Sequence, residues 1–163
     1  MLVVLSGLPG VGKTAIAREL AVALGAVHVR IDTIEQALRN AGWNVNGEGY
    51  AVAYAVAEEN LRLGRTVIAD CVNPWPLTRS EWNAVANRAG VRTLNVELVC
   101  SDGDEHRRRV ESRAGDIDGH KLPTWSEVVE RDYRAWSQDR LIVDTARSSV
   151  DESVRAILLA MRN

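Results

Sequence analysis

Eight residues near the start of the chain have the types and spacing of a phosphate-binding loop. Residues 7–14 read GLPGVGKT, the pattern G-x-x-x-x-G-K-[ST] between an apolar run and a helix-forming segment. The glycines allow successive backbone N–H groups to point into one concavity, and the start of the next helix adds partial positive charge. Lys13 can then reach the β- and γ-phosphates while the Thr14 hydroxyl ligates Mg²⁺. The pattern predicts a nucleoside triphosphate site that comprises Gly7, Leu8, Pro9, Gly10, Val11, Gly12, Lys13, Thr14 and Ala15.

Two aspartates follow apolar runs that read as strands. Asp32 ends the run 28–32, and its carboxylate could take the proton of an attacking hydroxyl or hold Mg²⁺ through water. The plainer alternative is an N-cap for the helix expected from Thr33, and the two roles are compatible. Asp70 follows the run 66–69, as a Walker B aspartate that holds Mg²⁺ or its water shell would, unless it is only a solvated loop residue.

An arginine-rich segment, residues 106–113, precedes a stretch with glycines and a proline. Arg109 and Arg113 are four residues apart, so on a helix they share one face and could neutralise charge on a transferring phosphoryl group. The alternatives are an exposed helix whose arginines pair with Glu105 and Glu111, or a patch that tracks nucleic-acid phosphates. The presence of Lys13 upstream favours the first interpretation.

Residues after the later strands are candidates for contact with a phosphate acceptor or with the nucleotide base. Asp144, after the run 141–143, is placed to border an adenine. For the aromatic candidates, packing and loop anchoring are equally good explanations. The acceptor candidates are Asp32, Arg39, Trp43, Tyr50, Asn73, Trp75 and Arg79; Trp82, Trp125 and Trp136 are expected to pack on helices.

Strand and helix patterns alternate along the chain, and the strands are short continuous apolar runs, as in a parallel sheet covered on both faces. We expect one α/β domain over residues 1–163, a three-layer P-loop NTPase fold with a five-stranded parallel sheet, similar to nucleoside-monophosphate kinases. A short lid is expected at about 109–124, where Gly115, Gly119 and Pro123 stand among polar residues. The expected strands are 2–6, 27–30, 65–69, 93–99 and 141–143, and the expected helices are 13–24, 33–42, 50–63, 78–89, 103–113, 125–136 and 150–161.

Composition narrows the class of protein. The chain has 163 residues, 46% of them hydrophobic, and a formal net charge of −2, which gives no general attraction to nucleic acid or to anionic membranes. No apolar run reaches the roughly 20 residues that a membrane span requires, and the glycine loop follows the first residues too closely for a signal peptide. Cys71 and Cys100 have no metal-type spacing, so we expect free thiols in the cytoplasm and no membrane partner. The sequence leaves the oligomeric state open.

Together these motifs resemble a family of small P-loop phosphotransferases that includes chloramphenicol phosphotransferase, zeta toxins and the kinase domain of polynucleotide kinases. The resemblance is carried by GLPGVGKT, Asp32, the segment VIAD at 67–70, the Arg109/Arg113 pair and IVDT at 142–145. It implies that Asp32 is a general base, that Lys13 and Thr14 handle phosphate and Mg²⁺, that Arg109 and Arg113 act from the lid, and that the nucleotide is ATP.

The expected function is an ATP-dependent transfer of the γ-phosphate to a hydroxyl of a small molecule such as an antibiotic, a sugar or a nucleoside. Alternatives are a polynucleotide 5′-hydroxyl kinase, a zeta-toxin-like nucleotide-sugar kinase, and a regulatory ATPase without an acceptor. Arg30, Arg39 and Arg62 are scattered rather than clustered, which argues against a polynucleotide and a nucleotide sugar. A shikimate- or gluconate-type kinase is a further option, and the single acid at Asp32 weakens its shikimate version.

Overall fold

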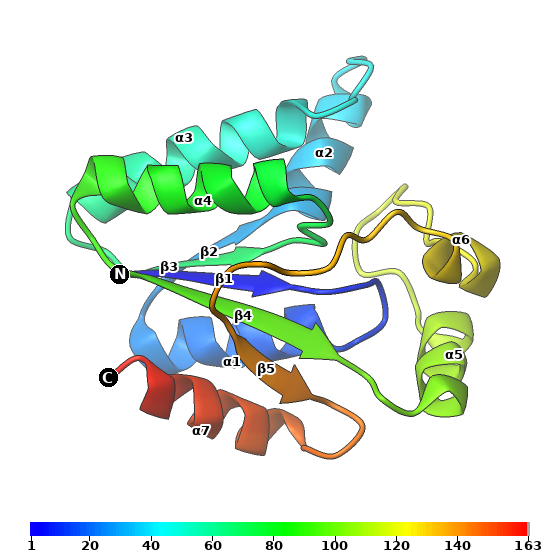
Figure 1. Ribbon diagram of the computed structural model, residues 1–163. Coiled ribbons are helices and arrows are strands. Elements are labelled where there is room, and N and C mark those ends of the chain that lie inside the picture. Colours follow the sequence, from blue (N-terminus) through cyan, green and yellow to red (C-terminus); the bar gives the residue numbers. More distant parts are fainter. Residues whose placement is uncertain (163) are drawn as a thin grey trace.

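A computed structural model describes residues 1–162 as three layers around one parallel sheet (Figure 1). The strands run in the order β2-β3-β1-β4-β5, and every pairing is parallel. Their bounds are β1 Leu2–Ser6, β2 Val27–Arg30, β3 Val67–Asp70, β4 Thr93–Val99 and β5 Leu141–Asp144. The helices are α1 Lys13–Leu24, α2 Ile31–Asn40, α3 Glu48–Arg62, α4 Pro76–Ala89, α5 Gly103–Ser112, α6 Trp125–Val129 and α7 Val150–Ala160. The predicted five-stranded P-loop fold is confirmed.

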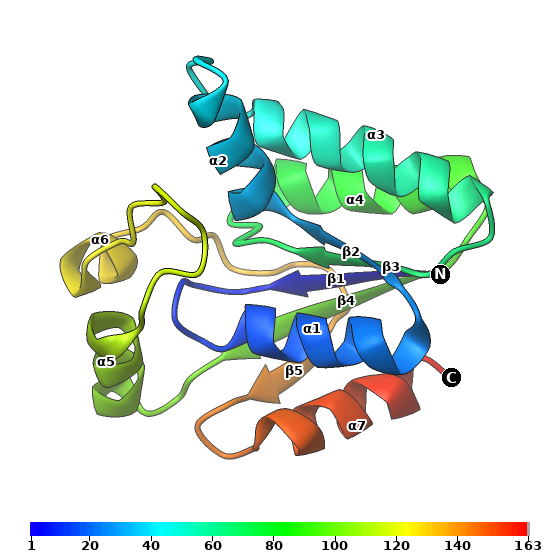
Figure 2. The same cartoon turned by 180° about the vertical axis from the view of Figure 1, so that it is seen from behind.

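The alternation of side chains along the strands builds a separate core on each face of the sheet. Val3 and Leu5 of β1 pack with α1 and α7, whereas Leu2 and Val4 pack with α3 and α4, and all four are fully buried. Trp82 of α4 is fully buried in the second core, as predicted. Figure 2 shows α1 and α7 on one side of the sheet and α2, α3 and α4 on the other, so helices cover both faces of the apolar strands.

Helices α5 and α6 lie beyond the carboxyl ends of the strands and are joined by residues 113–124, which form neither helix nor strand (Figures 1 and 2). We call residues 113–123 the lid segment. The carboxyl edge is where open parallel sheets bind ligands, because the first turns of the following helices also point there. In residues 1–162 no helix combines the length and the apolarity that a bilayer crossing requires.

Three element boundaries differ from the sequence prediction in ways that affect the site. Helix α2 begins at Ile31, so Asp32 lies inside its first turn and the N-cap is Arg30. The predicted N-cap role of Asp32 is therefore wrong. Helix α5 ends at Ser112, which leaves Arg113 in extended backbone.

The helix predicted at 125–136 stops at Val129. The backbone carbonyls of Arg134 and Ala135 accept hydrogen bonds from the Arg79 guanidinium, and Arg134 N donates to Pro74 O. These contacts with the core replace the helical hydrogen bonds that the sequence pattern suggested.

Candidate active site

The phosphate-binding loop has the geometry that its glycines predict. Helix α1 begins at Lys13 behind Gly12, and no side chain caps its first turn, so its N–H groups are free to meet an anion. Gly10 has φ +88°, and a Cβ there would lie 2.5 Å from Val110 Cγ2 of α5. Any larger residue at position 10 would be strained and would also collide with α5.

Lys13 and Thr14 engage partners close to where phosphates would bind. Lys13 Nζ donates to Leu8 O at 2.9 Å, and burial lowers the pKa of this lysine while the nearby Asp70 opposes that shift. Thr14 Oγ1 donates to Asp70 Oδ2 at 2.7 Å, which brings two oxygen ligands of the type that Mg²⁺ prefers into contact. These two residues therefore fit the metal site that the sequence predicts.

Asp70 is the last residue of β3 and is only 3% exposed. Burial raises its pKa, but His28, Lys13 and Thr14 together outweigh burial and hold the pKa below its ordinary value. His28 Nε2 lies 3.5 Å and Arg30 Nε 3.9 Å from Asp70 Oδ2. Asp70 is thus a buried carboxylate that stays ionised, and the solvated-loop interpretation does not apply to it.

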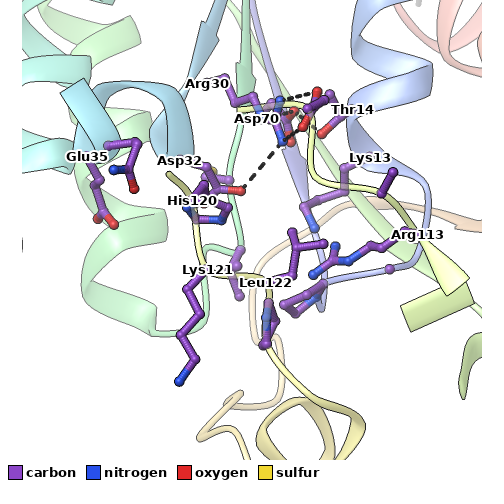
Figure 3. A pocket seen from close by; sticks show the side chains of 18 of the residues that line it. Lys13, Thr14, Arg30, Asp32, Glu35, Asp70, Arg113, His120, Lys121 and Leu122 are labelled. Carbon is purple, nitrogen blue, oxygen red and sulfur yellow. Dashed lines mark hydrogen bonds and ion pairs between the residues drawn. The ribbon is translucent and has the colours of Figure 1, made fainter. Parts of the chain in front are cut away.

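One cavity of about 1080 Å³ joins the phosphate-binding loop to α2 and the lid segment. Asp32 lines it from the first turn of α2, with 46% of its side chain exposed and Arg30 Nη2 4.0 Å from Oδ2. Lys13 and Arg113 line the same cavity, and the charge of Asp32 acts on the pKa of both. Figure 3 shows these side chains around one space, which His120 of the lid segment also lines.

The lid segment is tied to the core by a carboxylate that sequence reasoning did not select. Asp116 accepts from Arg30 Nη1 at 2.7 Å and Nη2 at 3.0 Å, and also from Arg18. The hydrogen bonds from Arg30, followed by those from Arg18, lower the pKa of Asp116. We call these three residues the lid clasp. Neither a helix face nor a known motif links residues 18, 30 and 116 in sequence, so only their position in the fold reveals the contact.

The two lid arginines have different surroundings. Arg109 donates to Glu105 Oε1 at 2.7 Å and to Thr145 Oγ1 and O at 3.0 Å each. Arg113 lies half-buried against the cavity, its Nε has no hydrogen-bond partner among the described residues, and burial lowers its pKa. Arg113 is therefore the arginine available to a bound anion, and its guanidinium faces the cavity in Figure 3.

A second cavity of about 300 Å³ adjoins the first, and Gly12 and Arg109 line both. Thr145, Ser148 and Ser149 also line it. Asp144, which we expected to border an adenine, lines neither cavity, because its carboxylate accepts from Ser101 N, Ser101 Oγ and Ala146 N. Of the loop residues, Gly7, Leu8 and Val11 also lie outside both cavities, while Pro9, Gly10, Gly12, Lys13, Thr14 and Ala15 line the first.

Most of the expected acceptor contacts support the fold instead. Tyr50 Oη accepts from Asn73 N at 2.9 Å, and Asn73 O accepts from Arg79 Nε at 3.1 Å, so the three residues form one hydrogen-bonded chain. Burial raises the pKa of Tyr50 well above its usual value. Trp75 donates to Asp132 Oδ2 at 3.1 Å, and Trp43 is 64% exposed. None of these five lines the cavity, whereas Asp32 and Arg39 do.

Helix α5 also rests directly on the phosphate-binding loop. His106 is buried, and its Nε2 lies 2.8 Å from Pro9 O. The other side of the imidazole meets the Trp125 indole of α6 edge-on, with ring centroids 5.1 Å apart. The predicted packing role of Trp125 is confirmed, and His106 is a link between the loop and α6 that sequence reasoning missed.

Comparisons with known proteins place this arrangement in a family. Solved structures with the same fold include a protein from Chloroflexus aurantiacus (TM-score 0.77, 19% identity, 99% of this chain and 95% of that one). A second is the Mycobacterium tuberculosis APS kinase CysC in complex with AMPPNP and APS (TM-score 0.72, 19% identity, 99% of this chain and 97% of that one). A third is Chaetomium thermophilum Kti12 in complex with ADP-AlF3 (TM-score 0.70, 22% identity, 98% of this chain and 98% of that one). No curated protein matches. The family AAA_33, described as an AAA domain, matches residues 2–136, and this chain, with its P-loop, carboxyl-edge cavity and small-kinase fold, belongs to that family.

Proposed function

We propose that this protein is a kinase that transfers the γ-phosphate of ATP to a hydroxyl group of a small molecule. One observation carries the proposal: an exposed carboxylate, Asp32, shares a cavity with the phosphate-binding loop and with Arg113, an arginine that has no hydrogen-bond partner among residues 1–162. A binding protein needs the loop, but it does not need an exposed carboxylate beside it. That combination of groups suits an in-line attack by a hydroxyl on the γ-phosphate.

In the proposed reaction, the acceptor oxygen forms a bond to the γ-phosphorus while the bond to the β–γ bridging oxygen breaks. The electron pair of that bond leaves with ADP, and the hydroxyl proton passes to Asp32. The N-terminus of α1 and Lys13 bind the phosphates, with the Lys13 ammonium exchanging its contact with Leu8 O for a phosphate oxygen. Arg113 stabilises charge on the transferring group, and the second cavity receives the base.

Thr14 and Asp70 would hold Mg²⁺, which, when bound, neutralises charge on the phosphates. ATP as the donor is supported by the APS kinase that was solved with an ATP analogue, and a kinase role by a Sinorhizobium meliloti gluconokinase of the same fold (TM-score 0.65, 20% identity, 98% and 90% covered). Cys71 and Cys100 are free thiols, which supports a reducing compartment such as the cytoplasm.

The surroundings of the arginines disfavour a polynucleotide acceptor. Arg107 pairs with Glu111 and Arg108 with Glu105, so the arginine run is neutralised along α5. Arg39 and Arg62 pair in the same way with Glu35 and Glu58. A nucleic-acid backbone needs a continuous positive track, and these pairs interrupt it.

The test is transfer of label from γ-labelled ATP to a panel of hydroxyl compounds by the wild type and by Asp32→Asn. Removal of a general base should lower kcat about 100-fold or more and leave the Kd for ATP within about twofold. Asp151→Asn is the matched control, because Asp151 occupies the corresponding place in the first turn of α7 and is not part of the cavity.

Two outcomes would overturn the proposal. An Asp32→Asn variant with wild-type kcat would exclude Asp32 as the base. ATP binding without transfer to any compound in the panel would favour the regulatory ATPase instead.

A further inference from the structure

The cavity changes character between its two ends. Five cations line the end near the phosphate-binding loop against two carboxylates, Asp70 and Asp116, which suits a polyphosphate. These cations are Lys13, Arg18, Arg30, Arg109 and Arg113. We call the other end the acceptor half; it is lined by α2, by residues 119–123 and by Glu127 and Arg131. Its charges balance, since Asp32, Glu35 and Glu127 stand against Arg39, Lys121 and Arg131. The acceptor half therefore gives no net attraction to an anionic acceptor.

The acceptor half also lacks a stacking surface. No tryptophan or tyrosine of the described residues lines the cavity, and His120 is the one aromatic ring in its wall. Trp43, Tyr50 and Trp75, which could have stacked on a base, lie outside. Aromatic ligands are usually held by aromatic or broad apolar surfaces, whereas the apolar side chains that the lid segment contributes to the cavity are only Ala114, Leu122 and Pro123. Most of the other side chains that line the cavity carry a hydrogen-bonding group.

A second carboxylate stands next to the proposed base in a defined position. Glu35 comes three residues after Asp32 on α2, so the two side chains share one face, and both line the cavity. Arg39 Nη2 donates to Glu35 Oε2 at 2.9 Å, which leaves Oε1 to accept another hydrogen bond. Only 21% of the Glu35 side chain is exposed, and Figure 3 shows it on the Asp32 side of the cavity.

The neighbouring helix α3 is shaped to receive Glu35. A Cβ built on Gly49 would lie 2.3 Å from Glu35 Cγ, so the absence of a side chain at position 49 makes room for the glutamate stem. Gly49 itself is buried in the first turn of α3. The Glu35 side chain is thus fixed by its hydrogen bond from Arg39 and by its close packing against Gly49, where a larger residue would collide with it. A glutamate that is only solvated at the surface has neither constraint.

We propose that the acceptor is an uncharged, non-aromatic polyhydroxylated molecule, a sugar or polyol, with Glu35 accepting a hydrogen bond from a hydroxyl next to the one that faces Asp32. The inference rests on the proposed kinase function and names its substrate class. Two carboxylates on one helix face suit neighbouring hydroxyl groups, because each carboxylate oxygen can accept one hydroxyl proton donor. Glu35 is a specificity-determining residue in this arrangement, and Asp32 remains the base.

Binding and transfer are measured separately, so that failure of this inference and failure of the kinase proposal can be told apart. Binding of myo-inositol, sorbitol and glucose to the ADP·Mg²⁺ complex is followed by saturation-transfer NMR, beside adenosine, glucose 6-phosphate, glucosamine and chloramphenicol. We expect binding of at least one uncharged polyol or sugar. Glu35→Gln should weaken it about tenfold, the loss of one charge-assisted hydrogen bond, with the Kd for ADP unchanged.

Gly49→Ala tests the positioning of Glu35 without touching a carboxylate. It should displace Glu35 and weaken polyol binding as Glu35→Gln does, while a thermal melt checks that the variant is folded. Glu59→Gln, an exposed glutamate on α3 outside the cavity, is the control and should bind as the wild type does.

The results separate the two proposals. Binding only of adenosine, chloramphenicol, glucosamine or glucose 6-phosphate, binding of none of the compounds, or polyol binding that Glu35→Gln leaves unchanged, would overturn the polyol inference. Polyol binding that depends on Glu35, without label transfer from ATP, would support the inference about the ligand and overturn the kinase proposal instead.

Discussion

Replacement of Arg79 should destabilise the protein more than replacement of any exposed arginine on the same helix. The Arg79 side chain is 1% exposed and donates hydrogen bonds of 2.7–3.1 Å to four carbonyl oxygens, those of Asn73, Pro74, Arg134 and Ala135. Its guanidinium also lies 4.2 Å from the centre of the Trp136 ring. Arg79→Leu would keep part of the apolar volume and leave the carbonyls of Asn73, Arg134 and Ala135 without a donor, whereas Pro74 O would keep its hydrogen bond from Arg134 N.

The expected loss follows from those contacts. A hydrogen bond with a charged donor contributes roughly 1.5–3 kcal/mol, and the cost of burying the guanidinium offsets much of the sum, so the net loss should be about 3–5 kcal/mol. For a chain of this size, that loss lowers Tm by roughly 6–20 °C.

Equilibrium unfolding in urea, followed by tryptophan fluorescence, measures the effect. Arg88→Leu is the control: Arg88 is also on α4, is 48% exposed, pairs with Glu58, and should cost less than about 1 kcal/mol. A loss below about 1 kcal/mol for Arg79→Leu would refute the reasoning. If Arg79 instead contacted an acceptor, Arg79→Lys would raise the acceptor KM without reducing stability.

Three other changes test the site. Gly10→Ala places a methyl group 2.5 Å from Val110 Cγ2 at φ +88°, and should weaken ATP binding at least about tenfold by calorimetry; wild-type affinity would contradict the steric argument. Thr14→Val removes the hydroxyl bonded to Asp70 and should abolish the Mg²⁺ dependence of ATP affinity, whereas an unchanged Mg²⁺ titration would exclude the metal assignment. Arg30 and Arg18 lower the pKa of Asp116 in the folded protein, so the lid clasp stabilises the fold when Asp116 is ionised. This stabilisation is complete above about pH 5. It is lost as the pH falls from the pKa of Asp116 in the unfolded chain toward its lower pKa in the folded protein. Asp116→Asn should remove that acid dependence and speed amide exchange in residues 114–122 about threefold at pH 7; exchange as slow as in the wild type would show that the clasp does not hold the lid segment.

The sequence predicted those parts of the molecule that local patterns determine. Apolar runs and glycine spacing are local, so the parallel sheet, the phosphate-binding loop and the assignment of Thr14 and Asp70 to one metal site followed from them. Asp32 was found because it follows a strand at the carboxyl edge of the sheet. Arg113 was found because it stands four residues after Arg109 in the segment before the lid, although the helix ends before it.

Contacts between distant segments were beyond the sequence pattern. Asp116 contacts Arg18 and Arg30, which are 98 and 86 residues away from it in the sequence. No local pattern around any of the three residues predicts these contacts. Arg79 was assigned to the acceptor because a charged side chain after a strand suggests a ligand. Its partners are instead four backbone carbonyls from two loops. Every residue has a backbone carbonyl, so the sequence does not indicate which carbonyls of a loop will accept a hydrogen bond.

The contact of His106 with Pro9 O and with the Trp125 indole gives the molecule an internal optical probe. The imidazole lies between the backbone of the phosphate-binding loop and a half-buried fluorophore, so movement of Pro9 is transmitted to the surroundings of Trp125 through one rigid ring. Trp43 and Trp75 are exposed, Trp82 is fully buried in the core and Trp136 packs against Arg79, so the emission of these four is set by environments away from the loop. Filling of the loop by a nucleotide should therefore change the emission of Trp125 selectively, and binding can be followed in the unlabelled protein in real time.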